Sequence, residues 1–149
     1  MQKIVASLWF DHNAREAVDY YLAVFKDSKE LSSTLYPSEG LADFQKDLAG
    51  KVLTIEFELN GQRFTALNAG SEFKFNEAIS FQVFCKDQAE IDYFWEKLSA
   101  VPESEQCGWC KDKFGVSWQI VPENIEDLMK KPGAWNTMMN QHKIIISEY

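Results

Sequence analysis

Residues 13–25 read NAREAVDYYLAVF and residues 87–98 read DQAEIDYFWEKL, so the chain contains one amphipathic pattern twice. In each stretch, apolar side chains recur every three or four residues, which is the spacing of one face of an α-helix. Each stretch also begins with an Asn or Asp that Glu follows three residues later, as in a capping box. The two pairs are Asn13 with Glu16 and Asp87 with Glu90. The repetition predicts two helices in two related modules.

Strand-like segments surround both predicted helices. Lys51–Leu59 alternates apolar and polar residues, and Asn60-Gly61 is a hairpin turn signal before the returning strand Gln62–Asn68. The expected strands lie near 3–10, 30–36, 51–59, 62–69, 77–85, 105–111 and 116–121. Both halves are therefore interpreted as β-α-β-β-β. Two such units bury their open sheets against each other and leave the helices outside, which predicts an α+β fold.

The expected organisation is one domain over residues 1–122, made of modules 1–70 and 75–122, followed by a tail over 123–149. The segment 37–49 is expected to be a loop or a short helix, and the tail to form one or two short helices. Trp135 and the run Ile144-Ile145-Ile146 have no place in the two-module pattern. We expect the tail to dock on a partner subunit or to cover the concave face of its own sheets.

Composition excludes several classes of protein. The chain has 149 residues, of which 46% are hydrophobic and 26% charged, so it is neither disordered nor fibrous. No apolar run approaches the roughly 20 residues that cross a bilayer, and no signal peptide is evident, which predicts a cytoplasmic protein. Fifteen basic and 23 acidic residues give a net charge of -8. Without a basic patch, neither nucleic acid nor a membrane is an expected partner.

Four segments resemble a known family. They are LWFDHNAREAVDYY (8–21), ALNAG (66–70), FKFNEAISF (73–81) and GWCKDKFGVSWQIVP (108–122). Together they resemble the PhnB-like, or demethylubiquinone methyltransferase-like, proteins of the glyoxalase/bleomycin-resistance (vicinal oxygen chelate) superfamily. The resemblance implies two tandem βαβββ modules that form a cupped sheet with outer helices, as in dihydroxybiphenyl dioxygenase.

The resemblance also tells where a metal would bind, because the superfamily's enzymes take a His or Glu from the first and last strands of each module. The corresponding strands of this chain supply no His or carboxylate apart from Glu77, at the edge of the strand that opens the second module. Gln119 stands where the superfamily places its glutamate, and Asn68 offers only a weak amide oxygen. A neutral amide does not balance the charge of a divalent metal as a carboxylate does. We expect no metal in the usual site and no cofactor.

The family label suggests methyl transfer, but the chain has no G-x-G-x-x-G turn of the kind that usually holds a nucleotide-like methyl donor. The leading hypothesis is therefore a metal-free protein that binds a small aromatic or apolar organic molecule. The first alternative is an enzyme of the superfamily acting as a lyase, an isomerase or an oxygenase-like protein. A methyltransferase is the last alternative.

Candidate ligand-binding residues follow from the resemblance, which places the face of Gln119 inside the cup and Asn68 near it. Four aromatic residues are candidate walls of the same cup: Trp9, Phe75, Phe81 and Trp109. The competing interpretation of each is packing in the core or at a subunit interface. Aromatic residues make up 14% of the chain and are favoured in the cores of interfaces. The resemblance also implies pairing, because members of the superfamily commonly form dimers, so we expect a homodimer.

The remaining reactive side chains are expected to be structural or solvated. Cys107 and Cys110 form a C-x-x-C pair, which elsewhere is a redox or zinc motif. Here the pair falls in a predicted strand, where residues three apart point to opposite faces. His12 lies in the turn before the first predicted helix and His142 lies in the tail, and both are interpreted as surface residues.

Overall fold

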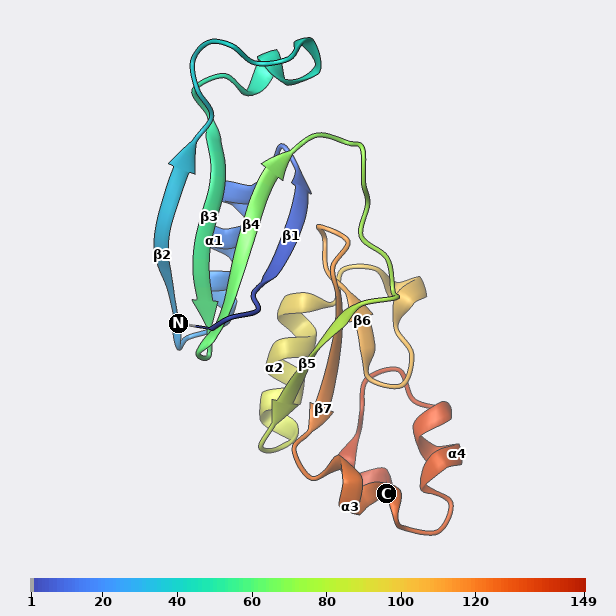
Figure 1. Cartoon of the computed structure of the whole chain (residues 1–149). Coiled ribbons are helices and arrows are strands. Elements are labelled where there is room, and N and C mark those ends of the chain that lie inside the picture. Colours follow the sequence, from blue (N-terminus) through green and yellow to red (C-terminus); the bar gives the residue numbers. More distant parts are fainter. Residues whose placement is uncertain (1) are drawn as a thin grey trace. The chain divides into compact units, whose positions relative to one another are not determined.

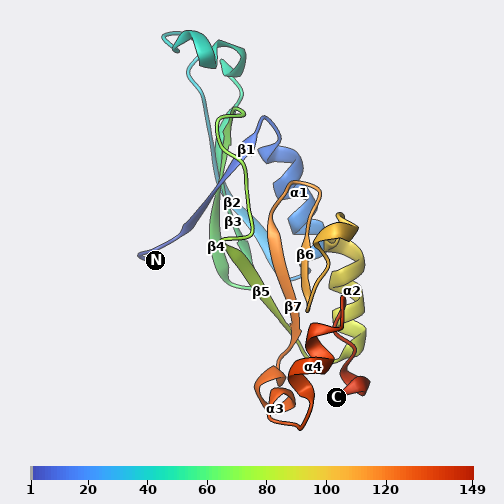
Figure 2. The same ribbon diagram turned by 90° about the vertical axis from the view of Figure 1, so that its right-hand side faces the viewer.

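The computed structural model describes residues 2–149 and divides the chain into two compact units (Figure 1). The N-terminal unit ends at Lys74, and the C-terminal unit runs from Phe75 to Tyr149. Each unit contains one sheet with one longer helix on one side of it, as Figure 2 shows. No helix within residues 2–149 is long and apolar enough to cross a membrane.

The N-terminal unit has a four-stranded sheet in the order β1-β4-β3-β2. Its elements are β1 (Ala6–Asp11), α1 (Ala14–Val24), β2 (Ser28–Leu35), the 3-10 helix η1 (Asp43–Leu48), β3 (Val52–Leu59) and β4 (Gln62–Ala69). β1 runs parallel to β4, whereas β3 is antiparallel to both of its neighbours. The predicted Asn60-Gly61 turn is confirmed, because both residues adopt the positive φ that such a turn requires.

Helix α1 covers one face of this sheet and buries the unit's core. Its stripe of Ala14, Ala17, Val18 and Tyr21 is fully buried, and the Tyr21 ring stacks 6.4 Å from that of Phe57. Every second residue of β3 and β4 faces the helix, as the alternation in the sequence predicts. The opposite face of the sheet carries no helix of its own unit (Figure 2).

The C-terminal unit has a three-stranded sheet in the order β5-β7-β6. Its elements are β5 (Ser80–Cys85), α2 (Gln88–Leu98), the 3-10 helix η2 (Pro102–Ser104), β6 (Trp109–Lys111) and β7 (Ser117–Pro122). The helices and seven strand positions expected from the sequence are all present, with ends that differ by a few residues. The second half differs from the expected βαβββ order, because η2 replaces the strand that would match β2. Pro102 lacks an N–H and so favours a 3-10 turn over strand pairing.

The tail forms α3 (Ile125–Met129), α4 (Ala134–Met139) and the 3-10 helix η3 (Ile146–Glu148), and it packs on its own unit. Ile144 is fully buried, and Gln88 of α2 accepts from Ile146 N at 2.8 Å and donates to Ile144 O at 2.9 Å. Cys107 N and Gly108 N donate to tail carbonyls at 2.8 Å. The tail is therefore an integral part of the C-terminal unit.

The two predicted capping boxes have different outcomes. In α2, Asp87 accepts from Glu90 N at 2.9 Å, which confirms the cap, although Glu90 reaches Lys86 N instead of Asp87 N. In α1 the prediction is wrong, because Asn13 makes no side-chain cap hydrogen bond. Asn68 of β4 takes its place and accepts from Ala14 N at 3.2 Å. Strand β4 therefore supplies the side-chain cap of α1, which the expected cap residue Asn13 does not provide.

Candidate functional site

The helix-free face of the C-terminal sheet carries a row of polar and aromatic side chains. Strand register sets Gln82 of β5, Gln119 of β7 and Trp109 of β6 side by side. Alternation along the strands puts these three on one face, and the buried residues Trp118 and Ile120 on the face that α2 covers. Two of the residues expected from the sequence, Trp109 and Gln119, are therefore direct neighbours.

Hydrogen bonding fixes one member of this row and leaves the others available. Gln119 Nε2 donates to Ser80 Oγ at 2.8 Å, which orients the amide across the sheet. Among the described residues, the Gln82 amide and the Trp109 indole N–H have no hydrogen-bond partner. Gln82 is exposed, while Trp109 and Gln119 are half-buried. The row can thus offer donors, acceptors and an aromatic surface to a ligand.

One cation lies beside this row and is already paired. Lys111 Nζ contacts Glu77 Oε2 at 2.6 Å, and the lysine side chain is 23% exposed. The hydrogen bond from Lys111 lowers the pKa of the Glu77 carboxyl below its ordinary value. Ser117 lies between Ser80 and Lys111 in strand register, and its buried hydroxyl has no hydrogen-bond partner in the structure.

Asp112 lies in the turn that joins β6 to β7 and accepts hydrogen bonds from that turn. Its side chain is 1% exposed, and Oδ1 accepts from Phe114 N at 2.8 Å and Val116 N at 3.1 Å. Oδ2 accepts from Trp118 Nε1 at 2.9 Å. These hydrogen bonds compensate the burial of the carboxyl group and tie it to the turn and to β7.

The N-terminal sheet also has a helix-free face with one aromatic residue. Trp9 of β1 donates a hydrogen bond from Nε1 to Gly70 O at 2.9 Å. Its ring packs edge-on against that of Phe73, with the ring centroids 4.8 Å apart. On the same face, Glu56 accepts from Thr65 Oγ1 at 2.8 Å and lies 3.4 Å from Arg63. Trp9 thus contacts the chain that leaves β4, and Glu56 is a paired carboxylate.

The other three expected residues have different surroundings. Asn68 is 7% exposed on the helix side of its sheet, where its amide caps α1 and donates to Val52 O at 3.0 Å. Phe81 is in register with Trp118 on the face that α2 covers, with ring centroids 5.6 Å apart. Phe75 lies beside Gly115 of the β6–β7 turn, where a Cβ built on the glycine would be 3.7 Å from Phe75 Cβ.

Strand alternation in the sequence already placed Ser117 on the face of Gln119, but sequence reasoning missed Gln82 and Ser80 as its neighbours. The signal was present, because polar residues alternate with apolar ones in both SFQVFC (80–85) and SWQIVP (117–122). Only the parallel pairing of these two strands, which are 37 residues apart along the chain, puts the polar positions on one face in one register.

The reactive side chains that metal or thiol chemistry would need are dispersed. Across residues 2–149, no three or more His, Cys, Asp or Glu side chains form a group that could hold a metal ion. All three cysteines are free thiols. Burial raises the pKa of Cys85 and of Cys110 to about 12, which keeps both protonated at neutral pH. Cys110 faces the α2 side of the sheet, and Cys107 lies in the preceding turn with a positive φ.

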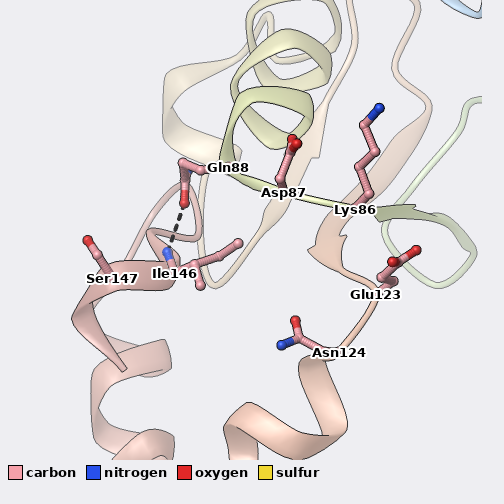
Figure 3. Close-up of a pocket in the computed structure, with 7 residues that line it drawn as sticks. All are labelled: Lys86, Asp87, Gln88, Glu123, Asn124, Ile146 and Ser147. Carbon is pink, nitrogen blue, oxygen red and sulfur yellow. Dashed lines mark hydrogen bonds between the residues drawn. The ribbon is translucent and has the colours of Figure 1, made fainter.

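A separate open pocket of about 580 Å³ lies where β5 and β7 end and α2 begins (Figure 3). Its lining residues are Lys86, Asp87, Gln88, Glu123, Asn124, Ile146 and Ser147. Figure 3 shows the Gln88–Ile146 hydrogen bond at one side of the pocket and Glu123 with Asn124 at the other. Small-molecule sites are usually lined mainly by apolar side chains. Three of the seven lining residues of this pocket are charged: Lys86, Asp87 and Glu123.

Comparisons with known proteins agree with this architecture. Residues 2–121 match the model of a family described as 3-demethylubiquinone-9 3-methyltransferase. The PhnB protein of Bacillus cereus is 33% identical, with a TM-score of 0.65 over 80% of this chain and 99% of that one. No curated protein is significantly similar to the chain.

Two more distant structures share the fold. Protein PA1353 of Pseudomonas aeruginosa is 19% identical, with a TM-score of 0.59 over 82% of this chain and 98% of that one. The fosfomycin resistance protein FosX of Listeria monocytogenes is 16% identical, with a TM-score of 0.53 over 88% of this chain and 99% of that one. These similarities describe the fold.

Proposed function

The chain belongs to the 3-demethylubiquinone-9 3-methyltransferase (PhnB-like) family, and from that premise we propose that it binds a small organic molecule on the helix-free face of its C-terminal sheet, without a metal ion. The observation that carries the proposal is the row Gln82–Gln119–Trp109, in which an aromatic surface and available amide groups adjoin. Organic ligands are held in this way, by apolar area for affinity and by a few polar groups for orientation.

The donors on each helix-free face, taken separately, support binding without a metal. Gln119 and Ser80 are neutral and hydrogen-bonded to each other. Glu56, on the N-terminal face, has its carboxylate engaged by Thr65 and Arg63. A divalent metal would have to compete with these partners, and a Lewis-acid site needs about three imidazole or carboxylate ligands with one open position.

The main competing function is catalysis. The name of the matched family suggests methyl transfer, and related folds include an antibiotic resistance protein. Fold alone does not establish chemistry, so the test must detect both binding and turnover. A binding protein returns its ligand unchanged, whereas a lyase, an isomerase, an oxygenase or a methyltransferase returns a product.

We propose that the protein acts as a homodimer. Large apolar side chains are exposed on both units, including Ile4, Leu35 and Phe44 on one, and Ile79 and Phe84 on the other. Such side chains favour association where they gather into one contiguous patch. Light scattering at tens of micromolar tests the proposal, and a mass of one chain contradicts it.

The experiment that tests the function screens the purified full chain by thermal shift against small aromatic compounds and S-adenosylmethionine, with and without added zinc or manganese. A ligand that binds the folded state raises the melting temperature. Each compound that does so is incubated with the protein and recovered for mass spectrometry. We expect saturable binding of an aromatic compound that is recovered unchanged and whose affinity does not depend on metal. A methylated or rearranged product, or metal-dependent binding, contradicts the proposal.

A further inference from the structure

Two sulfur atoms from separate segments of the C-terminal unit lie next to each other where solvent reaches them. Cys107 lies in the turn before β6, and its Sγ donates a hydrogen bond at 3.7 Å to Sδ of Met139, the last residue of α4. The Met139 residue is 43% exposed, and Cys107 is half-buried. Neither residue belongs to the row Gln82–Gln119–Trp109, so the pair is independent of the proposed ligand site.

Hydrogen bonds fix the turn and the tail segment that carry these sulfurs. Cys107 N and Gly108 N both donate to carbonyls of the tail at 2.8 Å. The side chain of Gln106 adds a third link, because its Nε2 donates to Met139 O at 2.8 Å. The two sulfurs are therefore brought together before any ligand arrives, and binding between them needs little further ordering.

The hydrogen bond between the sulfurs marks a position that a metal ion can occupy. The thiol proton of Cys107 points toward a lone pair of the Met139 thioether. Loss of this proton leaves a lone pair of each sulfur directed at one point. At the observed separation of 3.7 Å, an ion at the usual metal–thiolate distance of about 2.3 Å from both sulfurs makes an S–metal–S angle of about 107°.

Gln106 also stabilises the thiolate that metal binding requires. Its Nε2 donates to Cys107 Sγ at 3.2 Å. An amide NH₂ group has two protons, so one serves the sulfur while the other serves Met139 O. A hydrogen bond donated to the charged form of a group favours that form. The amide therefore compensates the negative charge on Cys107 when the proton leaves.

The chemistry of the two donors favours a soft monovalent ion. Thiolate and thioether sulfur bind Cu(I), whereas Zn²⁺ takes four ligands from Cys, His and carboxylates. Within residues 2–149, no three or more His, Cys, Asp or Glu side chains form a group that could hold a metal ion. The other two thiols do not compete, because burial raises the pKa of Cys85 and of Cys110 to about 12.

We propose that Cys107 and Met139 form a binding site for one Cu(I) ion. On binding, the S–H bond of Cys107 breaks, its proton goes to solvent, and Cys107 Sγ and Met139 Sδ each donate a lone pair to copper. The metal stays Cu(I), so no oxidant or reductant takes part. The single negative charge of the thiolate balances the single positive charge of the ion.

Anaerobic titration of the full chain with Cu(I), in competition with the chromogenic chelator bicinchoninate, measures the stoichiometry and the affinity. We expect one Cu(I) per chain. Cys107→Ser and Met139→Leu should each weaken Cu(I) binding at least tenfold, whereas Met138→Leu, at the neighbouring methionine of α4, should leave it unchanged. Failure of the chain to take copper from the chelator overturns the proposal. Equal binding by Met139→Leu and the unchanged chain also overturns it, because a thiol alone would then account for the binding.

X-ray absorption at the copper edge identifies the ligands without altering Cys107. The chain has four methionines, and selenium in their place labels the thioether position. We expect one copper–selenium and one copper–sulfur distance in the copper-loaded protein. The copper–selenium signal should disappear in Met139→Leu and persist in Met138→Leu. A copper-loaded chain without a copper–selenium signal overturns the proposal, while the proposed binding of an organic molecule is judged separately by the screen above.

Discussion

Asp112 is a buried carboxyl group that accepts hydrogen bonds from Phe114 N, Val116 N and Trp118 Nε1. In Asp112→Asn, one side-chain oxygen can still serve the two backbone N–H groups, but the new NH₂ group then faces the Trp118 indole N–H. We expect the free energy of unfolding to fall by about 1–3 kcal/mol, the cost of leaving a buried donor unpaired. Urea denaturation followed by tryptophan fluorescence measures the change.

The matched control for Asp112 is Asp127→Asn, because the Asp127 side chain is exposed and lies 3.5 Å from Lys130. Surface changes of this kind alter stability by less than about 0.5 kcal/mol. Equal stabilities of Asp112→Asn and the unchanged chain would show that the hydrogen bonds to Asp112 do not hold the turn.

His12 links two segments of the N-terminal unit through a pH-dependent contact. Its Nδ1 lies 2.6 Å from Asp11 Oδ1 and its Nε2 lies 2.7 Å from Asp47 Oδ2. The hydrogen bond with Asp11, and then that with Asp47, raises the pKa of His12 above its ordinary value of 6.5. Because the folded pKa is the higher one, the contact stabilises the fold fully below pH 6.5 and loses that effect as the pH rises through the folded pKa.

We therefore predict that segment 43–48, which contains Asp47, becomes less protected from hydrogen exchange as the pH rises through the pKa of His12. Exchange rates corrected for intrinsic pH dependence, together with an NMR titration of the His12 ring, measure both quantities. In Asp47→Asn the pKa of His12 should move back toward 6.5, because one of the two carboxylate partners is lost. An unchanged titration in that variant would contradict the predicted contact.

At the scale of single elements, the start of α1 depends on a residue outside the helix. Asn68 accepts from Ala14 N and donates to Val52 O, so it joins α1, β4 and the start of β3. We expect Asn68→Ala to lower the free energy of unfolding by about 1–3 kcal/mol, since a cap and a buried hydrogen bond are lost together. Chemical denaturation followed by circular dichroism measures it.

Asn13→Ala is the matched control for Asn68→Ala. The Asn13 side chain makes no cap hydrogen bond, and its buried Oδ1 has no partner. Its removal should therefore cost well under 1 kcal/mol, although Asn occupies the usual cap position in the sequence. If Asn13→Ala costs more than Asn68→Ala, the cap from β4 does not stabilise α1.

These caps show what could be predicted from local sequence. Periodicity located α1 and α2, because a helical stripe needs only residues three and four apart, and the alternation of β3 gave its buried face. The cap on α1 could not be predicted, since it comes from a residue 54 positions away in sequence. The same limit applies to the row on the C-terminal face, where Gln82 and Gln119 meet only through a parallel pairing.

At the scale of the whole molecule, the duplication is real but unequal. The first sheet has four strands and the second has three, and the tail packs on the second unit. A sequence repeat predicts similar modules. It does not reveal that the second module has the 3-10 helix η2 where the first has β2, or that the tail is added to the second module. Helices α3 and α4 have five and six residues, so their stability must come from packing rather than from helix propensity.

The structure therefore predicts that removing the tail damages the C-terminal unit. A chain that ends at Glu123 loses the buried Ile144 and the carbonyls that accept from Cys107 N and Gly108 N. Two backbone donors and an apolar surface become exposed. We expect a lower melting temperature and partial loss of near-ultraviolet circular dichroism. A truncated chain that melts like the full one would show that the tail adds no stability.

A single substitution tests the same packing in the full-length chain. A Cβ at Gly108 would lie 3.0 Å from Ile120 O and 3.1 Å from Ile144 Cγ1, in a backbone conformation with φ +85°. Gly133 has a similar φ of +78°, but nothing lies within 4 Å of its Cβ position. In both alanine variants, the left-handed backbone conformation lowers the free energy of unfolding by about 1–2 kcal/mol. Only Gly108→Ala also displaces Ile144. We therefore expect Gly108→Ala to unfold at a lower urea concentration than Gly133→Ala, whereas equal midpoints would contradict close packing of the tail on the β6 turn.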